Sequence, residues 1–366
     1  MSQDETRRSR RHNLLIIAFA VAVGATAAMQ ESPFPRGIGK VPDFRGFGGM
    51  NDPRYPEVLK SGLVARRIAD NVHVISVTNN VVVQTGDDGV FLADDSFSMF
   101  YDQIMGAVRK ISDKPVRIVT NSHAHGDHLQ NNATLAHMGA LVFAHPNTRL
   151  ALMRQGQAQP QRGNPPAGAP AQPGAAGAAG RGPAAGGGQA PIPPAGWPTI
   201  TTDAPMTFHF NGEDVMFLPL KPSHTDGDLA VYFTRSNVWS FGDAWTNDYP
   251  SIGVPQGGTV ENFVDNYNRA LALTNEDTIF VPGHGQLGKR ADLIANRDAL
   301  MVIHDRFLKM VRDGMTLEQI REARPTKEYD ARFATEICCS PNNVQTSTRF
   351  YEQMYNEVKT HLPATR

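Results

Sequence analysis

Cysteine is nearly absent from this chain of 366 residues. The two cysteines, Cys338 and Cys339, are adjacent and cannot close an ordinary disulfide loop. The fold must therefore be stable without a disulfide framework, and neither cysteine stands where a lipoprotein anchor would need it. A hydrophobic content of 40% is enough to build one large core or two modest ones.

The chain also lacks an excess of charge of either sign. With 35 Lys and Arg against 36 Asp and Glu, its formal net charge is −1. Nucleic-acid binding depends on a basic surface that neutralises phosphates, so the composition argues against a nucleic-acid partner. No Gly-x-Ser-x-Gly motif is present, which argues against a serine hydrolase. We expect a small-molecule substrate, and the sequence leaves the oligomeric state open.

The first 28 residues contain an apolar run that is too short to span a bilayer comfortably. Basic residues in 7–11 precede the apolar run 14–23, and 25–27 offers a small-residue cleavage site. This order predicts an export signal over 1–28 that is cleaved, with an uncleaved anchor as the alternative. Ser9-Arg10-Arg11 suggests a twin-arginine signal. We therefore expect a periplasmic or secreted protein without stable membrane insertion after cleavage.

Apolar runs alternate with turns and helical patterns along the rest of the chain. Three β-like runs predict a β-meander, and four more predict separate strands: 72–77, 81–85 and 90–93, then 116–120, 215–220, 238–242 and 278–283. Helical patterns cover 99–111, 261–273, 287–311 and 351–358. This periodicity predicts an α/β or α+β fold.

Between Arg154 and Trp197 the composition changes abruptly to Pro, Gly, Ala and Gln. Such a segment cannot bury enough apolar surface to offset the entropy of ordering it. We predict that 154–197 is a disordered insertion within one domain, because candidate ligands lie on both sides of it. A lid over the functional site is the alternative.

The strongest functional signal is a histidine-rich segment directly after the β-like run 116–120. His123, His125, Asp127 and His128 stand within six residues of one another. Two histidines at i and i+2 on extended backbone point to the same side and can share one ion. Asp127 and His128, past the turn, can face a second ion. Neutral imidazole and carboxylate suit Zn²⁺, and less exclusively Fe²⁺ or Mn²⁺.

Three further candidates occupy the same kind of position along the chain. His224, Asp243 and His284 each come just beyond a β-like apolar run. Loops at strand ends, held by a rigid sheet, are where an α/β fold usually builds its site. We therefore expect four strand ends to bring these residues together.

These motifs resemble those of the metallo-β-lactamase superfamily. The matching segments are His-Ala-His-Gly-Asp-His at 123–128, Ser-His-Thr-Asp-Gly-Asp at 223–228, Ser-Phe-Gly-Asp at 240–243 and Val-Pro-Gly-His-Gly at 281–285. The resemblance implies an αββα sandwich in a single catalytic domain over 63–326. An N-terminal extension at 29–62 and a C-terminal helical segment at 327–366 would flank that domain.

The resemblance also implies a set of ligands. One ion would be held by His123, His125 and His224, a second by Asp127, His128 and His284, and Asp243 would bridge the two. Asp at the bridging position is typical of the glyoxalase II, lactonase and general hydrolase branches, whereas the best-known class B β-lactamases have Cys or Ser there. A second departure is Gln130-Asn131-Asn132, where many relatives have Gly-Gly-Asn, and we interpret it as a local change in packing.

The function implied is that of a dinuclear zinc hydrolase. A metal-bridging hydroxide, oriented by Asp127, would attack the carbonyl of an ester, lactone, thioester or cyclic amide, with β-lactams among the cyclic amides. One alternative is a mononuclear iron oxidoreductase of the persulfide dioxygenase type. Another is a binding protein with a structural zinc, although structural zinc sites are closed by four protein ligands.

Two groups of residues near these loops are weaker candidates. Asp226 and Asp228 are candidates to orient imidazole N–H groups, with capping of the turn after His224 as the alternative. Four aromatic residues are candidates to line the substrate pocket, with core packing as the alternative: Phe97, Phe100, Trp245 and Tyr249.

Overall fold

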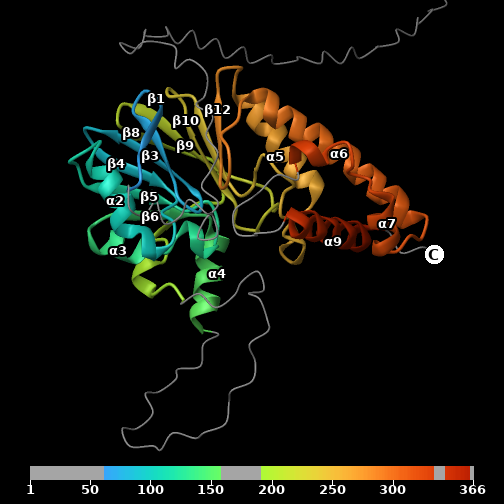
Figure 1. The fold of residues 1–366 in the computed structure, drawn as a ribbon. Coiled ribbons are helices and arrows are strands. Elements are labelled where there is room, and N and C mark those ends of the chain that lie inside the picture. The colour runs from blue at the N-terminus through green and yellow to red at the C-terminus, as the bar shows by residue number, and fades with distance from the viewer. Residues whose placement is uncertain (1–61, 158–190, 334–342, 363–366) are drawn as a thin grey trace, which may run out of the picture. The chain divides into compact units, whose positions relative to one another are not determined.

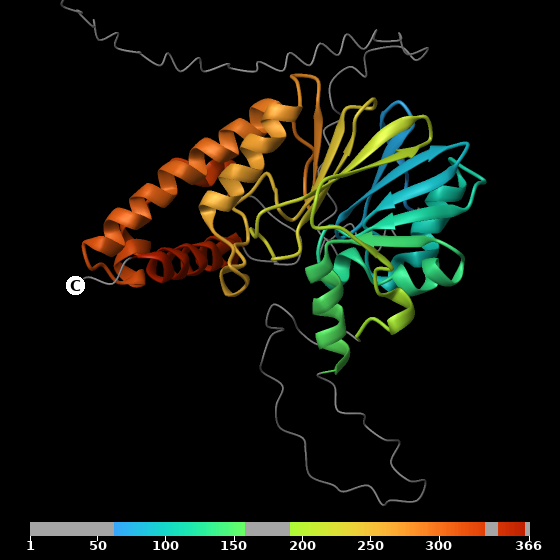
Figure 2. The ribbon, with the colours of Figure 1, turned by 180° about the vertical axis from the view of Figure 1, so that it is seen from behind.

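The computed structural model describes residues 62–157, 191–333 and 343–362. The predicted export signal, nearly all of the N-terminal extension and both cysteines lie outside the described residues. Two β-sheets stand face to face, and helices cover the outer side of each (Figure 1). The view from behind shows the same succession of layers (Figure 2).

The first sheet has seven strands in sequence order. They are β1 (Arg66–Ala69), β2 (Val72–Ser76), β3 (Asn80–Gly86), β4 (Gly89–Ala93), β5 (Val116–Thr120), β6 (Leu141–Ala144) and β7 (Ile200–Thr201). Strands β1 to β4 pair antiparallel, which confirms the predicted meander, and β4 to β7 pair parallel. The pairing changes from antiparallel to parallel at β4. As a result, the carboxyl ends of β2, β4, β5 and β6 lie at one edge of the sheet.

The second sheet has five strands in the order β12-β11-β10-β9-β8. They are β8 (Met206–Phe210), β9 (Glu213–Pro219), β10 (Leu229–Phe233), β11 (Val238–Gly242) and β12 (Ile279–Pro282). Strands β11 and β12 are parallel, and the other pairs are antiparallel. Strands β9, β11 and β12 therefore run in one direction and end at the same edge.

Helices form the outer layers. They are α2 (Tyr101–Arg109), α3 (Asn132–His137), α4 (Pro146–Gln157), α5 (Val260–Leu273), α6 (Arg290–Arg312), α7 (Leu317–Ala323), α8 (Asp330–Phe333) and α9 (Asn343–His361), with short 3₁₀ turns η2 (Ser98–Phe100), η3 (Gly126–His128), η4 (Pro194–Gly196) and η5 (Val254–Gln256). The four predicted helices are confirmed as α2, α5, α6 and α9, although α9 begins eight residues earlier than expected. Thr259 caps α5 by accepting a hydrogen bond from the backbone N–H of Asn262.

Apolar side chains fill the space between the two sheets. Phe91 of β4 packs edge-to-face on Phe233 of β10, with ring centroids 5.4 Å apart, and Phe143 of β6 lies 5.2 Å from Phe217 of β9. Strands β4, β10 and β11 are buried along their whole length because helices cover the opposite face as well. Burial on both faces explains why these strands read as continuous apolar runs. The αββα architecture is confirmed.

Both ends of the segment predicted to be disordered are ordered. Helix α4 continues to Gln157, and η4 begins at Pro194. The side chain of Ile192 is buried against Leu152, and Trp197 donates a hydrogen bond to the carbonyl of Ile192. The predicted boundaries 154 and 197 were therefore wrong, because composition does not show that a single Ile or Trp can anchor the ends. Residues 158–190 lie outside the described residues.

The C-terminal helix packs against the rest of the fold. Phe350 stacks on Tyr249 at a centroid distance of 4.5 Å, and Tyr351 packs edge-to-face on Phe307 of α6. These rings belong to the apolar cluster on the outer face of the second sheet. Within the described ranges, no helix has the length and apolar composition needed to cross a membrane.

Candidate metal centre

The strand ends meet as expected. His123, His125, Asp127 and His128 follow β5, and the other three candidates follow strands of the second sheet: His224 after β9, Asp243 after β11 and His284 after β12. The seven side chains gather into two neighbouring groups, each of which draws on both sheets. The sequence-based expectation that these residues come together is thus what the structure shows.

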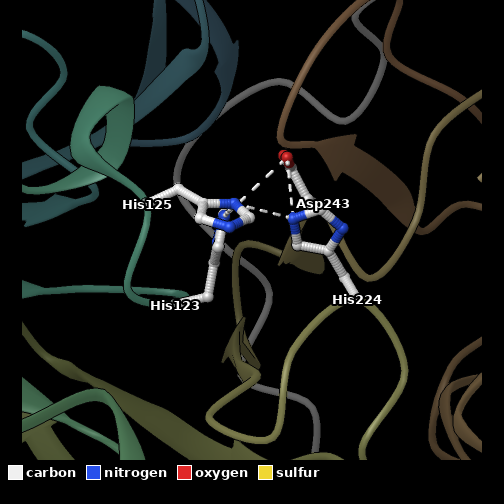
Figure 3. Close-up of side chains that lie close together, drawn as sticks. All are labelled: His123, His125, His224 and Asp243. Carbon is white, nitrogen blue, oxygen red and sulfur yellow. Dashed lines mark hydrogen bonds and ion pairs between the residues drawn. The ribbon is translucent and has the colours of Figure 1, made fainter. Parts of the chain in front are cut away.

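The first group contains three imidazoles and a carboxylate. His125 Nδ1 lies 2.9 Å from His123 Nε2 and 3.0 Å from His224 Nε2. Asp243 Oδ2 lies 3.4 Å from His224 Nε2 and 3.8 Å from His123 Nε2. Figure 3 shows these four side chains pointing toward one another from three different loops.

The second group contains Asp127, His128 and His284. His284 Nε2 lies 3.1 Å from Asp127 Oδ2 and 3.3 Å from His128 Nε2. The other oxygen of Asp243, Oδ1, lies 3.4 Å from the Nε2 atoms of both histidines. Asp243 therefore presents Oδ2 to the first group and Oδ1 to the second.

Asp243 Oδ1 is buried and has no hydrogen-bond donor among the described residues. A buried carboxylate oxygen without a donor or a cation is costly. The carboxylate of Asp243 lies between the two groups, where a bridging ligand would lie, because its two oxygens face histidine nitrogens of different groups.

The hydrogen bonds behind the histidines fix which nitrogen faces the centre. His224 Nδ1 is 3.0 Å from the carbonyl oxygen of Ser251, His284 Nδ1 is 2.6 Å from that of Thr78, and His128 Nδ1 is 2.7 Å from Asp94 Oδ2. These acceptors place a proton on each Nδ1, so Nε2 of the neutral ring carries a lone pair.

Nitrogen lone pairs that face each other at this distance repel unless a cation, either a proton or a metal ion, lies between them. Four ligand atoms bound tetrahedrally at about 2.0–2.2 Å are separated by about 3.3–3.6 Å. Six neighbouring pairs of nitrogen and oxygen atoms in the two groups are 2.9–3.8 Å apart, and all ligand atoms of a group lie within 4.8 Å of one another. The donor set, its spacing and its tautomers therefore fit two divalent metal ions.

The electrostatics of the two groups differ. Burial lowers the pKa of His123 well below its ordinary value, and burial also lowers the pKa of His224, so both are neutral, as metal ligands must be. Burial opposes protonation of His284 as well, but the carboxylates of Asp243 and Asp127 raise the pKa of His284 to about 10. A group of carboxylates that attracts a proton in this way also attracts a divalent cation.

Asp94 was missed by the sequence analysis. Its carboxylate accepts hydrogen bonds from His128 Nδ1, from the backbone N–H of Ser122 at 2.7 Å and from Ser122 Oγ at 2.9 Å. It has a φ of 62°, a left-handed conformation that is uncommon outside glycine and often marks a functional position. Asp94 directly follows β4, so the strand-end rule that identified the other residues could have found it.

Two glycines allow the loops of Asp243 and the histidine-rich segment to approach closely. A Cβ on Gly283 would lie 1.9 Å from Asp243 Oδ1, and a Cβ on Gly242 would lie 2.3 Å from the Cβ of Ser122. Gly242 also has a φ of 57°. Larger residues at either position would displace the bridging carboxylate or the start of the histidine-rich segment.

Asp226 and Asp228 do not contact an imidazole ring. Asp228 accepts hydrogen bonds from Ser223 Oγ, the backbone N–H of His224 and both N–H and Oγ1 of Thr225. It therefore caps the turn, which was the alternative to orienting the ring. The backbone carbonyl of Asp226 accepts a hydrogen bond from Asn147 Nδ2 at 2.9 Å. The carbonyl of Ser251 orients the His224 ring instead. Ser251 belongs to a different loop, and sequence spacing could not place that loop beside His224.

Three of the four aromatic pocket candidates belong to the core. Trp245 is fully buried against Phe241 and Phe280, Phe100 is buried beneath the first sheet, and Tyr249 is stacked on Phe350. Core packing, which was the alternative to a pocket role, is what the structure shows for these three rings, because nearness in sequence to a site loop does not fix which way a ring points. Phe97 is half-buried against the same cluster as Phe100.

Asn131 and Asn132 hold the histidine-rich segment in place through their side-chain amides. Asn131 Nδ2 donates to the carbonyl of Asp95 at 2.6 Å, and Asn132 Nδ2 donates to Asn121 Oδ1 at 2.8 Å and to the carbonyl of Gly196 at 3.0 Å. These amides connect the histidine-rich segment to the loop that follows β4 and to the ordered end of the insertion.

Comparisons with known proteins agree with this architecture. Neither a protein-family model nor a curated protein matches the chain. Among solved structures it is similar to a double mutant of the sec-alkyl sulfatase PisA1, with 16% identity, a TM-score of 0.54 and coverage of 86% of this chain and 53% of that one. It also matches a metallo-β-lactamase from Pontibacter korlensis (14% identity, 65% of this chain and 99% of that one, TM-score 0.48) and the metallo-β-lactamase IND-7 (18% identity, 64% and 98%, TM-score 0.47). The two packed sheets, the helical layers and the likeness to the sulfatase structure show that the chain has the metallo-β-lactamase fold.

Proposed function

We propose that this protein is a dinuclear zinc hydrolase that cleaves an ester, lactone, thioester or cyclic amide. The observation that carries the proposal is the position of Asp243, whose two oxygens face two separate groups of histidine and aspartate. A single ion bound by the first group would use Oδ2 of this carboxylate and leave Oδ1 without a cation. Two bound zinc ions would supply a water of lowered pKa and would polarise the carbonyl of the substrate.

The protein residues would hold and orient the reacting groups. His125 is exposed, while His123, His224, His128 and His284 are buried, so the substrate would approach on the side of His125. Asp127 lies 3.1 Å from His284 Nε2 and keeps 16% of its side chain exposed. From there it can accept a hydrogen bond from the attacking water and hold a lone pair toward the carbonyl carbon.

The mononuclear iron oxidoreductase is a weaker proposal. A single ion in the first group would leave Asp127, His128 and His284 without a role, although their nitrogens and oxygens have the same spacing as those of the first group. A structural zinc is also less suitable, because the exposed edge at His125 leaves the centre open.

The sequence is the support for our proposal on the place of action and the partners. We propose that the protein acts in the periplasm or outside the cell after removal of 1–28, on a small-molecule substrate and without nucleic acid. Export weakens a role with an intracellular thioester, and aspartate at the bridging position points to lactones and esters before β-lactams.

A hydrolysis screen on one preparation of the mature protein tests the proposal. Aryl esters, acyl-homoserine lactones, thioesters and β-lactams would be assayed, and the metals would be measured by elemental analysis of the same sample. We expect close to two zinc ions per chain in the candidate centre and hydrolysis of at least one class, lost on chelation and restored by zinc. One tightly held iron without hydrolysis would instead support the oxidoreductase.

A further inference from the structure

A third group of potential ligands lies in the helical layer over the second sheet. It consists of Glu261 in the first turn of α5, His304 in α6 and Glu357 in α9. His304 Nε2 lies 3.3 Å from Glu357 Oε2 and 3.5 Å from Glu261 Oε1, and all three ligand atoms are within 4.8 Å of one another. The three helices lie on the same side of the sheets in both ribbon views (Figures 1 and 2). The group shares no residue with the candidate metal centre.

Glu357 is the residue that calls for an explanation. It is only 1% exposed, and neither carboxylate oxygen has a hydrogen-bond donor among the described residues. A carboxylate buried in this way must be paired or coordinate a metal. The nearby His361 does not satisfy it, because His361 Nδ1 donates to the backbone carbonyl of Glu357 at 2.8 Å and lies 3.8 Å from Oε1.

His304 alone does not satisfy both carboxylates either. Its Nε2 could donate one hydrogen, but both oxygens lie beyond the usual 2.7–3.2 Å range of an N–H···O bond. By contrast, separations of 3.3 and 3.5 Å match the about 3.3–3.6 Å expected between ligands of a tetrahedral zinc ion. Burial opposes a charge on His304, but the carboxylate of Glu357 raises the pKa of His304, so the group attracts a cation. With His304 neutral, the two carboxylates would balance the charge of a divalent ion.

The exposure of Glu261 gives the group an open side. Its side chain is 62% exposed, whereas that of His304 is 13% exposed, so an ion could enter from solvent and keep a water as its fourth ligand. We propose that Glu261, His304 and Glu357 form an additional zinc site that ties α9 to α5 and α6. Because α9 packs on the loop that orients His224, this site would hold the C-terminal helix in its working position.

The test compares zinc content in full-length, zinc-loaded protein. His304→Gln should bind one zinc fewer per chain than the unchanged protein after dialysis against the same free zinc concentration. The control is His209→Gln. It removes an exposed histidine of β8, which pairs with Asp214 of β9, and should leave the zinc count unchanged. The result is the difference in zinc content between the variants and not the total zinc content. It therefore does not depend on whether the candidate centre binds two ions.

A second variant protects the test against misfolding. Glu261→Gln alters only an exposed side chain and should weaken zinc binding at this site at least tenfold, with an unchanged circular dichroism spectrum. Equal zinc content and equal affinity in the unchanged protein, His304→Gln and Glu261→Gln would overturn the proposal. That outcome would mean that His304 and Glu357 form only a buried ion pair.

Discussion

In the proposed function, Asp127 of the second group both binds an ion and orients the attacking water. Replacing it with Asn keeps its shape and removes the charge that faces His284 Nε2 at 3.1 Å. We expect Asp127→Asn to lose most of the second zinc, and to lower kcat and kcat/KM together by about 10²-fold, which corresponds to roughly 2.7 kcal/mol of transition-state stabilisation. Steady-state kinetics and elemental analysis would measure both effects.

Asp113→Asn is the matched control for this variant. Asp113 is exposed in the turn after α2, so the same chemical change there should leave metal content and rate nearly intact. Wild-type zinc content and rate in Asp127→Asn would refute the assignment of the second group.

Gly283 is predicted to be the least replaceable glycine near the centre. In Gly283→Ala the new Cβ would meet Asp243 Oδ1 at 1.9 Å and the backbone carbon of Gly242 at 2.8 Å. Because backbone cannot move aside cheaply, we expect the bridging carboxylate to shift and zinc to be lost from both groups. Gly106→Ala in α2 is the control, since its Cβ would meet no heavy atom within 4 Å and should stabilise the fold by about 0.5–1 kcal/mol. Full zinc occupancy in Gly283→Ala would contradict the geometry.

Residue types and their order along the chain predicted the seven candidate ligands, because the ends of parallel-running strands must share an edge. They did not predict the partners of those ligands. The Thr78 and Ser251 carbonyls orient His284 and His224 through backbone atoms, which carry no sequence signal. Trp245 likewise could not be assigned to core or pocket until the direction of its side chain was known.

At the scale of elements, the two ends of the insertion pack against the fold, whereas composition predicts that the residues between them are dispensable. Residues 191–197 are fixed by the burial of Ile192 and by Trp197, whose ring lies 5.8 Å from the Arg149 guanidinium. We predict that replacing 158–190 with a short Gly/Ser bridge changes the melting temperature and the zinc content little. Calorimetry on the deletion variant would check this.

Extending the deletion through 197 provides the contrast. It would also remove Ile192 and Trp197 from their cluster with Leu129 and Leu152, so the melting temperature should fall by several degrees. If the shorter deletion alone lowered the melting temperature as much, residues 158–190 would have to pack. Loss of activity without loss of stability would instead indicate a lid.

The amide side chain of Gln353 in α9 contacts the 251–252 loop, whose Ser251 carbonyl orients His224. Gln353 accepts a hydrogen bond from the backbone N–H of Ile252 at 3.0 Å and donates to Ser251 Oγ at 3.2 Å, while the Ser251 carbonyl faces His224 Nδ1. We expect Gln353→Ala to weaken zinc at the first group about 10–100-fold, as the loss of groups that orient metal ligands typically does. Competition with a chromophoric chelator would measure the affinity.

Glu352→Gln is the control on the neighbouring position of α9. It breaks only an exposed ion pair with Arg321, which is worth about 0–1 kcal/mol. Similar zinc affinities in Gln353→Ala and Glu352→Gln would show that the 251–252 loop is held without α9.

At the scale of the whole molecule, metal should contribute measurably to stability. Each group of the candidate centre takes ligands from both sheets, so an ion binds the folded arrangement and not the unfolded chain. At a free zinc concentration 100 times the dissociation constant, one site stabilises the folded state by about 2.7 kcal/mol. We therefore predict that chelation lowers the melting temperature by several degrees and that added zinc restores it. Identical calorimetric transitions before and after chelation would rule out metal binding in the folded state.

The insertion divides the candidate ligands as well as the chain. His123, His125, Asp127 and His128 precede residues 158–190, and His224, Asp243 and His284 follow them. A single peptide-bond cut within 158–190 would therefore yield two fragments, each with half of the intersheet core and an incomplete set of ligands. Neither fragment could chelate as the intact protein does, and their reassociation would create the centre. The fold thus offers a division into two fragments whose joint metal binding would report on the meeting of the two parts.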